Sequence, residues 1–302
     1  MKSLHDLLSY DVVLIDGMNT ATIEFFSKKG LSYRGEPTGM LYGVCRKINQ
    51  LFRYASRRSP IYWLWEGFGS VRKAKYPTYK ANRDKSMYFD THGFKQGLLD
   101  IRTALSLIKG IHQLTHDKLE ADDLAGYLTE QAISQGKSVL LVSTDTDWYQ
   151  FVKSEQVHVM KRNDILTPED LRKSLGHEPA NVLVYKMLRG DSTDNIKPIP
   201  RFPSFLAKRI AQNISIQVSD NIDSLFLALL DADYTGFLRW KDLVGQHREL
   251  LYMNYYLIKS HNEIVSVDHL KQNRVVGCAN KSHWLSFCQN RGLKSIESVF
   301  YS

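Results

Sequence analysis

The chain has 302 residues, of which 43% are hydrophobic and 24% are charged. This length allows one large domain or two modest ones, and the apolar fraction excludes a chain that is mainly disordered. Lys and Arg number 40 against 32 Asp and Glu, a net charge of +8. That excess favours a polyanionic partner, nucleic acid first and an anionic membrane surface second.

Cysteines and apolar runs narrow the class of protein further. The three cysteines are Cys45, Cys278 and Cys288. So odd and sparse a set argues against a disulfide framework and fits a reducing compartment. His283 lies between the last two, but the spacing and the missing fourth ligand disfavour zinc. No apolar run approaches the ~20 residues of a membrane span, and polar residues occupy the place of a signal-peptide core. We therefore expect a cytoplasmic protein that does not enter a membrane.

Short apolar runs at residues 11–15, 61–65 and 138–142 are typical of buried strands. Helical patterns lie between them, with an apolar stripe over residues 38–57 and a second helix around residues 119–135. Strands that alternate with helices predict an α/β fold with a central, mostly parallel sheet flanked by helices. After about residue 165 the pattern becomes mostly helical, with helices expected near 178–189, 204–212, 221–230 and 246–259.

Acidic residues follow each of the three predicted strands. Asp16 ends the first, Glu66 ends the second, and Asp145 and Asp147 follow the third. Because the carboxyl ends of parallel strands gather ligands, we expect these side chains to form one acidic rim.

Two further acidic clusters extend this set: Glu120, Asp122 and Asp123 open the helix before the third strand, and Asp191 and Asp194 lie in a turn between helices. Taken singly, each cluster is explained by helix-dipole or turn preferences. Together the nine carboxylates could converge only with cations, and oxygen ligands select Mg²⁺ or Mn²⁺. Metals about 4 Å apart would clamp a phosphodiester and activate water. The set thus indicates a nuclease.

Between the second strand and the acidic helix lies a basic, aromatic-rich segment. Residues 57–85 hold eight Lys and Arg but two acids. Basic side chains neutralise phosphates and aromatic rings stack on unpaired bases. Trp63 and Trp65 are expected in the core, whereas Tyr76, Tyr79 and Lys80 are candidates for substrate contact.

Five motifs in this order resemble the metal-dependent 5′-nucleases, which include flap endonucleases, phage-type 5′-3′ exonucleases and the 5′-nuclease domain of bacterial DNA polymerases. The motifs are Leu-Ile-Asp-Gly at 14–17, Val-Arg at 71–72 with Tyr-Lys-Ala-Asn-Arg at 79–83, Leu-Glu-Ala-Asp-Asp at 119–123, Ser-Thr-Asp-Thr-Asp at 143–147, and Gly-Asp-Ser-Thr-Asp-Asn at 190–195. The resemblance covers residues 11 to about 210 and fades beyond 215. The compact length is most similar to the stand-alone phage or bacterial members.

The resemblance implies roles for particular residues. One metal would be held by Asp16, Glu66, Glu120, Asp122 and Asp123, and a second by Asp145, Asp147, Asp191 and Asp194. Lys80 and Arg83 would contact the scissile phosphate, and catalysis would rest on these two with Asp16, Asp123 and Asp145. Nucleic-acid contacts would come from Arg72, Tyr76, Tyr79, Lys80, Arg83, Arg201, Lys208 and Arg209. The implied organisation is a catalytic α/β domain at 1–189 with a helical arch near 70–112, and a helical lobe at 190–302.

Two positions depart from the family pattern. Glu66 stands where the family usually has Asp, which we expect to shift the metal without losing it. In the segment that would form a helix-hairpin-helix for duplex DNA, Arg201 and Pro203 replace glycines. Neither residue readily takes φ > 0 and Pro has no N–H, so backbone binding of phosphate and K⁺ is disfavoured there. Side-chain charge from Arg201, Lys208 and Arg209 would take over.

These observations predict a monomeric Mg²⁺-dependent 5′-nuclease acting near 5′ ends or branch points of DNA, and also on RNA/DNA hybrids, in primer or flap removal. The C-terminal helices would either cover the core or bind a replication protein, and a packed terminus is favoured over a docking one. The alternatives are a PIN-type ribonuclease, which lacks the arch, and a non-catalytic DNA-binding protein on the same fold, which should have lost acids. Setting aside the nine acids leaves 23 acidic against 40 basic residues, so the remaining chain carries +17 around a pocket of −9.

Overall fold

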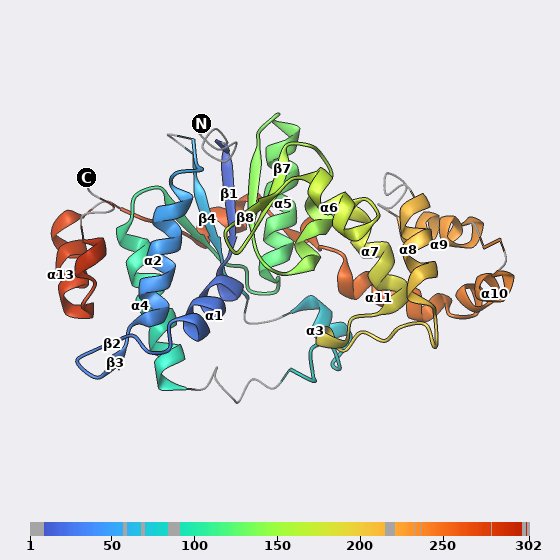
Figure 1. Cartoon of the computed structure of the whole chain (residues 1–302), viewed down its shortest axis with the longest axis horizontal. Coiled ribbons are helices and arrows are strands. Elements are labelled where there is room, and N and C mark those ends of the chain that lie inside the picture. The colour runs from blue at the N-terminus through green and yellow to red at the C-terminus, as the bar shows by residue number, and fades with distance from the viewer. Residues whose placement is uncertain are drawn as a thin grey trace.

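The computed structural model describes residues 9–56, 59–67, 70–83, 91–214, 221–232, 234–235, 237–278, 280–297 and 300. Two regions make up this part of the chain. An α/β region is built on a central sheet, and a helical lobe extends from one end of it (Figure 1).

Within the described residues, seven strands form the central sheet in the order β8-β7-β6-β1-β4-β5-β9. The strands are β1 (Val12–Asp16), β4 (Ile61–Leu64), β5 (Ile111–Leu114), β6 (Val139–Val142), β7 (Val157–Lys161), β8 (Asp164–Leu166) and β9 (Arg274–Val276). The inner strands β7, β6, β1, β4 and β5 run parallel, and β8 and β9 are antiparallel at the two edges. The predicted mostly parallel sheet is confirmed.

Strand β1 lies between the two other strands that carry acids. Its Ile15 is in register with Trp63 of β4 on one side and with Val142 of β6 on the other. The carboxyl ends of all three strands therefore meet at one edge of the sheet, as parallel pairing requires.

Both faces of the sheet are covered by helices. On one face Val13 and Ile15 pack into a core that includes residues of α2 (Gly39–Leu51), α4 (His92–Leu107) and α13 (Lys281–Arg291). On the other face Val12 and Leu14 pack in a core with residues of α5, η2, α6 and α12. Those elements span α5 (Ala121–Ser134), η2 (Thr146–Phe151), α6 (Pro168–Leu175) and α12 (Val267–Gln272). Apolar side chains on both faces explain why β1 is continuously apolar.

The helical lobe has its own apolar core. It is built from α7 (Val182–Arg189), α8 (Ser204–Asn213), α9 (Ile222–Asp231), α10 (Leu238–Gln246) and α11 (Arg248–Ile258). The remaining elements are α1 (Gly17–Ser27), β2 (Ser32–Tyr33), β3 (Glu36–Pro37), α3 (Val71–Lys75), η3 (Pro179–Asn181), η4 (Ser192–Asp194), η6 (Asn262–Ile264) and η7 (Lys294–Ile296). Strands β2 and β3 form a hairpin outside the main sheet.

The C-terminal part does not stay with the helical lobe. Strand β9 pairs antiparallel with β5, and Trp284 of α13 is buried in the core beside α4. Figure 1 shows α13 at the end of the molecule opposite the lobe. The predicted boundary at residue 190 therefore fails for β9 and α13, because β9 is hydrogen-bonded to the sheet and Trp284 and Cys288 of α13 are buried in the core of the α/β region.

The arch predicted near residues 70–112 has different outcomes in different parts of the segment. Its last part is α4, whose Phe94 and Ile101 are fully buried in the core, followed by β5 inside the sheet. The arch prediction is therefore wrong for these residues. Between α3 and α4, residues 84–90 lie outside the described residues, and the arch stays a prediction there.

Candidate active site

The predicted acids lie at the edge of the sheet where the parallel strands end. Asp16 ends β1 and caps α1, where its Oδ1 accepts the Asn19 N–H at 3.0 Å and its Oδ2 accepts the Ser143 hydroxyl at 2.9 Å. Burial, with a smaller contribution from the charge of Asp145, still raises the pKa of Asp16 to about 6. The hydrogen bonds to Asp16 therefore do not offset the cost of burying its charge.

Burial also raises the pKa values of Glu66 and Asp147. Burial and the nearby charges of Glu120 and Asp16 raise the pKa of Glu66 to about 7. Burial likewise raises the pKa of Asp147 to about 6, and Asp145 adds to the effect. Because each shift includes a contribution from a neighbouring acid, the carboxylates from β1, β4, β6 and α5 act as one electrostatic group.

Lys80 lies among the carboxylates of this group. Its Nζ is 2.5 Å from Glu120 Oε2 and 3.8 Å from Asp194 Oδ2. Burial alone would raise the pKa of Glu120, but Lys80 and Arg72 lower it to about 2. Arg83 pairs with Asp194 from the more exposed side. The structure thus places Lys80 and Arg83 beside Glu120, which caps α5, and Asp194 of η4.

The backbone at Lys80 is left-handed, with φ +55°. A non-glycine residue in this region costs free energy and needs support from its surroundings. The Lys80 N–H donates to the Asp194 carbonyl at 2.9 Å, and the Asn195 side chain donates to the Thr78 carbonyl at 2.8 Å. These bonds join the segment at 76–83 to the turn that carries Asp194, so the two motifs are positioned together.

Lys186 is a site residue that the sequence analysis missed. Its Nζ pairs with Asp147 and lies 2.7 Å from Asp191 Oδ2. Although burial opposes the shift, Lys186 and the Thr193 hydroxyl lower the pKa of Asp191. The available signal was a basic residue in the last turn of α7, directly before the acidic turn.

Arg72 and Tyr79 face inward. The Arg72 side chain is fully buried, with Nη1 2.8 Å and Nη2 2.7 Å from the two carboxylate oxygens of Asp123. Tyr79 is also buried, and its hydroxyl lies 3.2 Å from both Glu120 Oε2 and Asp194 Oδ2. The predicted nucleic-acid contacts by Arg72 and Tyr79 are therefore wrong, because neither side chain is accessible to a substrate.

The carboxylate of Asp123 is likewise occupied by hydrogen bonds within the protein. Besides Arg72, its oxygens accept the N–H of His261 at 2.7 Å and the N–H of Glu120 at 2.9 Å. It is fully buried, so the structure places it behind the site, in contrast to its predicted role as a metal ligand and catalytic acid. We use "acid cluster" below for the eight other acids: Asp16, Glu66, Glu120, Asp122, Asp145, Asp147, Asp191 and Asp194.

The other predicted nucleic-acid contacts remain accessible to different degrees. Tyr76 is half-buried and packs its ring on Tyr256. Arg201 and Lys208 are exposed, and Arg209 is half-buried on α8. Their contacts with nucleic acid stay predictions.

Arg201 corrects one expectation about the hairpin. It adopts φ +57°, the left-handed conformation that we expected it to avoid. The Phe202 N–H donates to the Ile199 carbonyl, closing a turn with Pro200 and Arg201 at its centre. Proline at the second position is favoured in type I and type II turns alike, and the positive φ at the third position is the feature of a type II turn, which usually has Gly or Asn there. Arg201 thus adopts φ > 0 although it is not a glycine.

The acid cluster fits divalent cations by its chemistry. Its metal-ligating atoms would be carboxylate oxygens, which suit Mg²⁺ and Mn²⁺. Burial, with smaller contributions from neighbouring acids, raises the pKa values of Asp16, Glu66 and Asp147, and a bound cation would favour their charged forms. Among the described residues, no three Asp, Glu, His or Cys side chains are grouped closely enough to hold a metal ion as they stand. Instead Lys80 bridges Glu120 and Asp194, Lys186 bridges Asp147 and Asp191, and Arg83 pairs with Asp194. Metal binding would therefore require these cations to give way.

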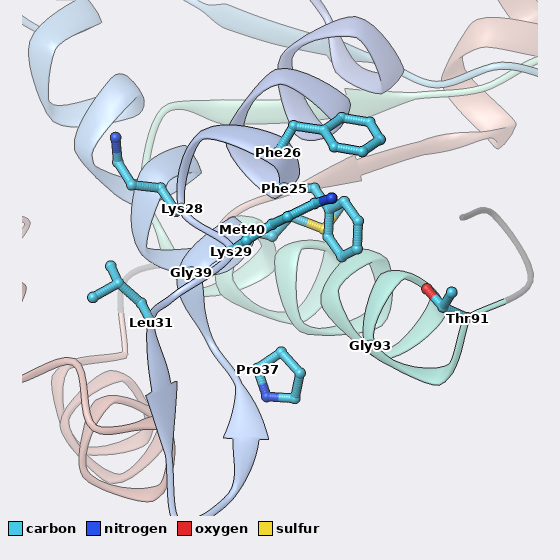
Figure 2. A pocket seen from close by; sticks show the side chains of 10 residues that line it. All are labelled: Phe25, Phe26, Lys28, Lys29, Leu31, Pro37, Gly39, Met40, Thr91 and Gly93. Carbon is cyan, nitrogen blue, oxygen red and sulfur yellow. The ribbon is translucent and has the colours of Figure 1, made fainter. Parts of the chain in front are cut away.

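An apolar cavity of about 630 Å³ lies away from the acid cluster, beyond the far end of α1 (Figure 2). Phe25, Phe26 and Met40 line it together with Pro37 of the hairpin and the start of α4. Lys28 and Lys29 stand at its rim. Sequence reasoning did not predict this cavity, because its walls come from four separate elements.

No helix in the part of the chain that the structure describes has the length and apolar character needed to cross a membrane. Of the cysteines that flank His283, Cys288 is buried whereas Cys278 is exposed.

Known proteins are similar to this chain in sequence and in fold. The family described as "5′-3′ exonuclease, N-terminal resolvase-like domain" matches residues 11–176. A 5′-3′ exonuclease of Buchnera aphidicola is 27% identical over 267 residues, which cover 77% of this chain and 91% of the relative. A thermostable DNA polymerase I of Thermus thermophilus is 25% identical over 264 residues. That match covers 87% of this chain but 30% of the polymerase, so the chain spans less than a third of that relative.

A solved structure with the same fold is the flap endonuclease of bacteriophage T5, in a complex with DNA and metal ions. It superposes with a TM-score of 0.61 at 20% identity, over 86% of this chain and 95% of that protein. Fold likeness at this identity concerns the architecture, and it agrees with the mostly parallel sheet described above.

Proposed function

The chain belongs to the family of 5′-3′ exonucleases with an N-terminal resolvase-like domain and is a nuclease that hydrolyses phosphodiester bonds; we propose that its substrate is DNA and that it works as a Mg²⁺-dependent 5′-nuclease. Cleavage would occur near 5′ ends or branch points, in primer or flap removal, with RNA/DNA hybrids as further substrates. The cytoplasm, a monomeric state and a replication partner remain our predictions for its setting.

One observation carries this proposal. Lys80 and Arg83, which come from one short segment, lie against Glu120 and Asp194 of the acid cluster and are partly exposed. A site that combines many carboxylates with accessible cations suits a phosphodiester, because the carboxylates bind metals and the cations attract the substrate. An acidic pocket alone would repel DNA.

Two groups of carboxylates would hold Mg²⁺. Asp16, Glu66, Glu120 and Asp122 form the group near Lys80, and Asp145, Asp147, Asp191 and Asp194 form the group near Lys186. The chemistry that Mg²⁺ supplies at such groups is charge neutralisation and a bound water of lowered pKa.

The chain's own cations then act on the substrate. Lys80, whose ammonium pairs with Glu120 in this structure, would donate hydrogen bonds to a phosphate oxygen when that carboxylate is neutralised. Arg83 can do so from the exposed rim, where its planar guanidinium matches the geometry of phosphate. Both would stabilise the negative charge that develops on the phosphate during attack by water.

The proposal is tested with a product ladder. Substrates with a 5′ flap, a nick, a single strand or an RNA/DNA hybrid are incubated with Mg²⁺, and products are sized from each end. We expect short products released from the 5′ end or at the branch. Products that begin at the 3′ end, or no cleavage of any substrate, would refute the proposal.

A substitution then assigns the chemistry to the acid cluster. Asp145→Asn should lower the cleavage rate by about 10³-fold or more, since metal-ion stabilisation is worth several kcal/mol, while DNA binding survives. Asp164→Asn, an exposed acid at the start of β8, serves as the matched control and should cleave normally. If Asp145→Asn cleaves at the rate of the control, the assignment of the chemistry to the acid cluster is wrong. This pair also separates an enzyme from a non-catalytic DNA-binding protein.

Duplex binding by the hairpin is a separate part of the proposal. Arg201→Ala should weaken duplex affinity and reduce the slope of log affinity against log salt by about 1, the expectation for one lost phosphate contact. Lys161→Ala, an exposed lysine at the end of β7, is the control of equal charge change. If Arg201→Ala matches that control in affinity and in slope, the hairpin does not grip DNA through this side chain.

A further inference from the structure

The end of the helical lobe nearest the sheet is attached to the first turn of α5 by a buried network. Arg72 Nε donates to the Leu257 carbonyl at 2.9 Å, and Arg72 Nη2 donates to the Lys259 carbonyl at 2.7 Å. These carbonyls belong to the last turn of α11 and the residue after it, where a helix leaves carbonyls without partners of its own. The His261 N–H donates to Asp123 at the start of α5.

The same network reaches the acid cluster directly. Asp123 accepts the N–H of Glu120 through Oδ2, the oxygen that also receives Arg72 Nη1. Arg72 Nη1 is in addition 3.9 Å from Glu120 Oε2. One guanidinium thus fixes both the backbone and the charge of Glu120 while it holds the end of α11.

We propose that Arg72 and Asp123 are positioning residues that lock the acid cluster to the helical lobe, so that the docked end of α11 sets the position of Glu120. The inference deepens the proposed function, on which it rests for the catalytic role of Glu120. It assigns the family-motif arginine at 72 to the coupling of two regions of the protein.

The electrostatics of the two helices favour this arrangement. The carboxyl end of α11 carries partial negative charge and faces the Arg72 guanidinium, whereas the amino end of α5 carries partial positive charge and holds the Asp123 carboxylate. Arg72 and Asp123 therefore neutralise each other and both helix ends at once. A shift of α11 would break several of these bonds together, and the start of α5 would move with it.

Lysine cannot reproduce this network. A guanidinium presents five donors in a planar fork, and Arg72 uses them on two carboxylate oxygens and two carbonyls. A single ammonium keeps the charge but cannot reach all four acceptors. Arg72→Lys thus removes the positioning geometry without leaving Asp123 unpaired.

The experiment measures Mg²⁺ binding by calorimetry on the full chain without DNA, so that it needs no cleavage. We expect Arg72→Lys and Asp123→Asn to weaken Mg²⁺ affinity about tenfold or more. The control is Arg291→Lys, whose Nη2 lies 2.6 Å from Asp100 and ties α13 to α4 away from the acid cluster. It should lose thermal stability without any change in Mg²⁺ affinity.

Hydrogen exchange provides a second measurement, which a merely stabilising pair would not match. In Arg72→Lys, amide exchange should accelerate together at residues 120–123 and 257–261, and turnover should fall through kcat more than through KM. Unchanged Mg²⁺ affinity in both variants, an equal loss in the Arg291→Lys control, or faster exchange in one of the two segments alone would overturn the inference. Asp123→Asn carries the test if Arg72→Lys does not fold.

Failure of the proposed function has a different signature. A wild-type chain that binds Mg²⁺ but cuts no DNA would refute the nuclease assignment, whereas the effect of Arg72→Lys on Mg²⁺ affinity would still support the positioning role. If the wild-type chain cuts DNA but Arg72→Lys leaves Mg²⁺ affinity unchanged, the nuclease assignment would stand and the positioning role would be refuted.

Discussion

Arg72 and Arg83 come from the same short segment and each pairs with an aspartate at the site, yet their surroundings are opposite. The Arg72 side chain is 0% exposed and contacts Asp123, which is also 0% exposed. Arg83 is 43% exposed and contacts Asp194 from the solvent side. A buried cation stays paired with its carboxylate, because separating the two would leave a buried charge without a partner. A half-exposed cation can exchange its carboxylate partner for a phosphate at little cost in free energy.

Tyr79 and Lys80 repeat the contrast at adjacent positions. Tyr79 belongs to the apolar core of the helical lobe, and its hydroxyl lies within hydrogen-bond distance of Glu120 and Asp194. Lys80 pairs with the same two carboxylates from a partly exposed position. The left-handed backbone at Lys80 allows the two side chains to approach from different sides. The segment thus has an inward set, Arg72 and Tyr79, that supports the acids, and an outward set, Lys80 and Arg83, that meets the substrate.

The sharpest test of this comparison is stability. Arg72→Met should lower the free energy of unfolding by about 3–5 kcal/mol, because it leaves Asp123 buried without its charge partner. Arg83→Met should change the free energy of unfolding by about 1 kcal/mol or less, as expected for an exposed pair. Urea unfolding followed by circular dichroism measures both. Equal losses of unfolding free energy would show that the two arginines contribute equally to stability and that the comparison is wrong.

Lys80→Ala addresses the outward set. It should reduce the single-turnover cleavage rate by about 10²–10³-fold, the usual effect of removing one donor to a developing oxyanion. Lys75→Ala is the control, since Lys75 lies on the neighbouring α3 with its Nζ over the Tyr256 ring. A cleavage rate for Lys80→Ala close to that of Lys75→Ala would place Lys80 with the inward, supporting residues.

Tyr79→Phe should cost less unfolding free energy than Arg72→Met and more than Arg83→Met. Loss of a hydroxyl that donates to two carboxylates should cost about 1.5–3 kcal/mol of unfolding free energy, while DNA affinity without metal stays unchanged. Tyr76→Phe, a half-buried neighbour packed on Tyr256, is the matched substitution. A drop in DNA affinity for Tyr79→Phe but not for Tyr76→Phe would show that Tyr79 contacts the substrate, as Lys80 and Arg83 are proposed to do.

Much of the site was predictable because its residues are fixed by short-range pattern. Asp16, Asp145 and Asp147 follow apolar strands, and parallel strands place their carboxyl ends together. Glu120 and Asp122 open a helix, which fixes them to its first turn. Lys186 escaped prediction because its partners, Asp147 and Asp191, come from two different motifs.

Other features escaped prediction for related reasons. Strand β9 is a three-residue edge strand, too short for a periodic signal, and its place beside β5 depends on a partner far away in the chain. Arg201 adopts φ +57° inside the turn that the Phe202–Ile199 hydrogen bond closes, although the residue type alone argues against φ > 0. In both cases the context outweighed the local preference.

The sequence by itself determined the α/β order, the strand ends and the acids that they carry, since these depend on the alternation of neighbouring residues. Only the tertiary structure decided which cations face inward. Arg72 and Arg83 have the same chemistry, and their roles differ because α11 covers one and leaves the other at the surface. Burial depends on segments far apart in the chain, so no local pattern encodes whether a charged side chain supports the site or meets the substrate.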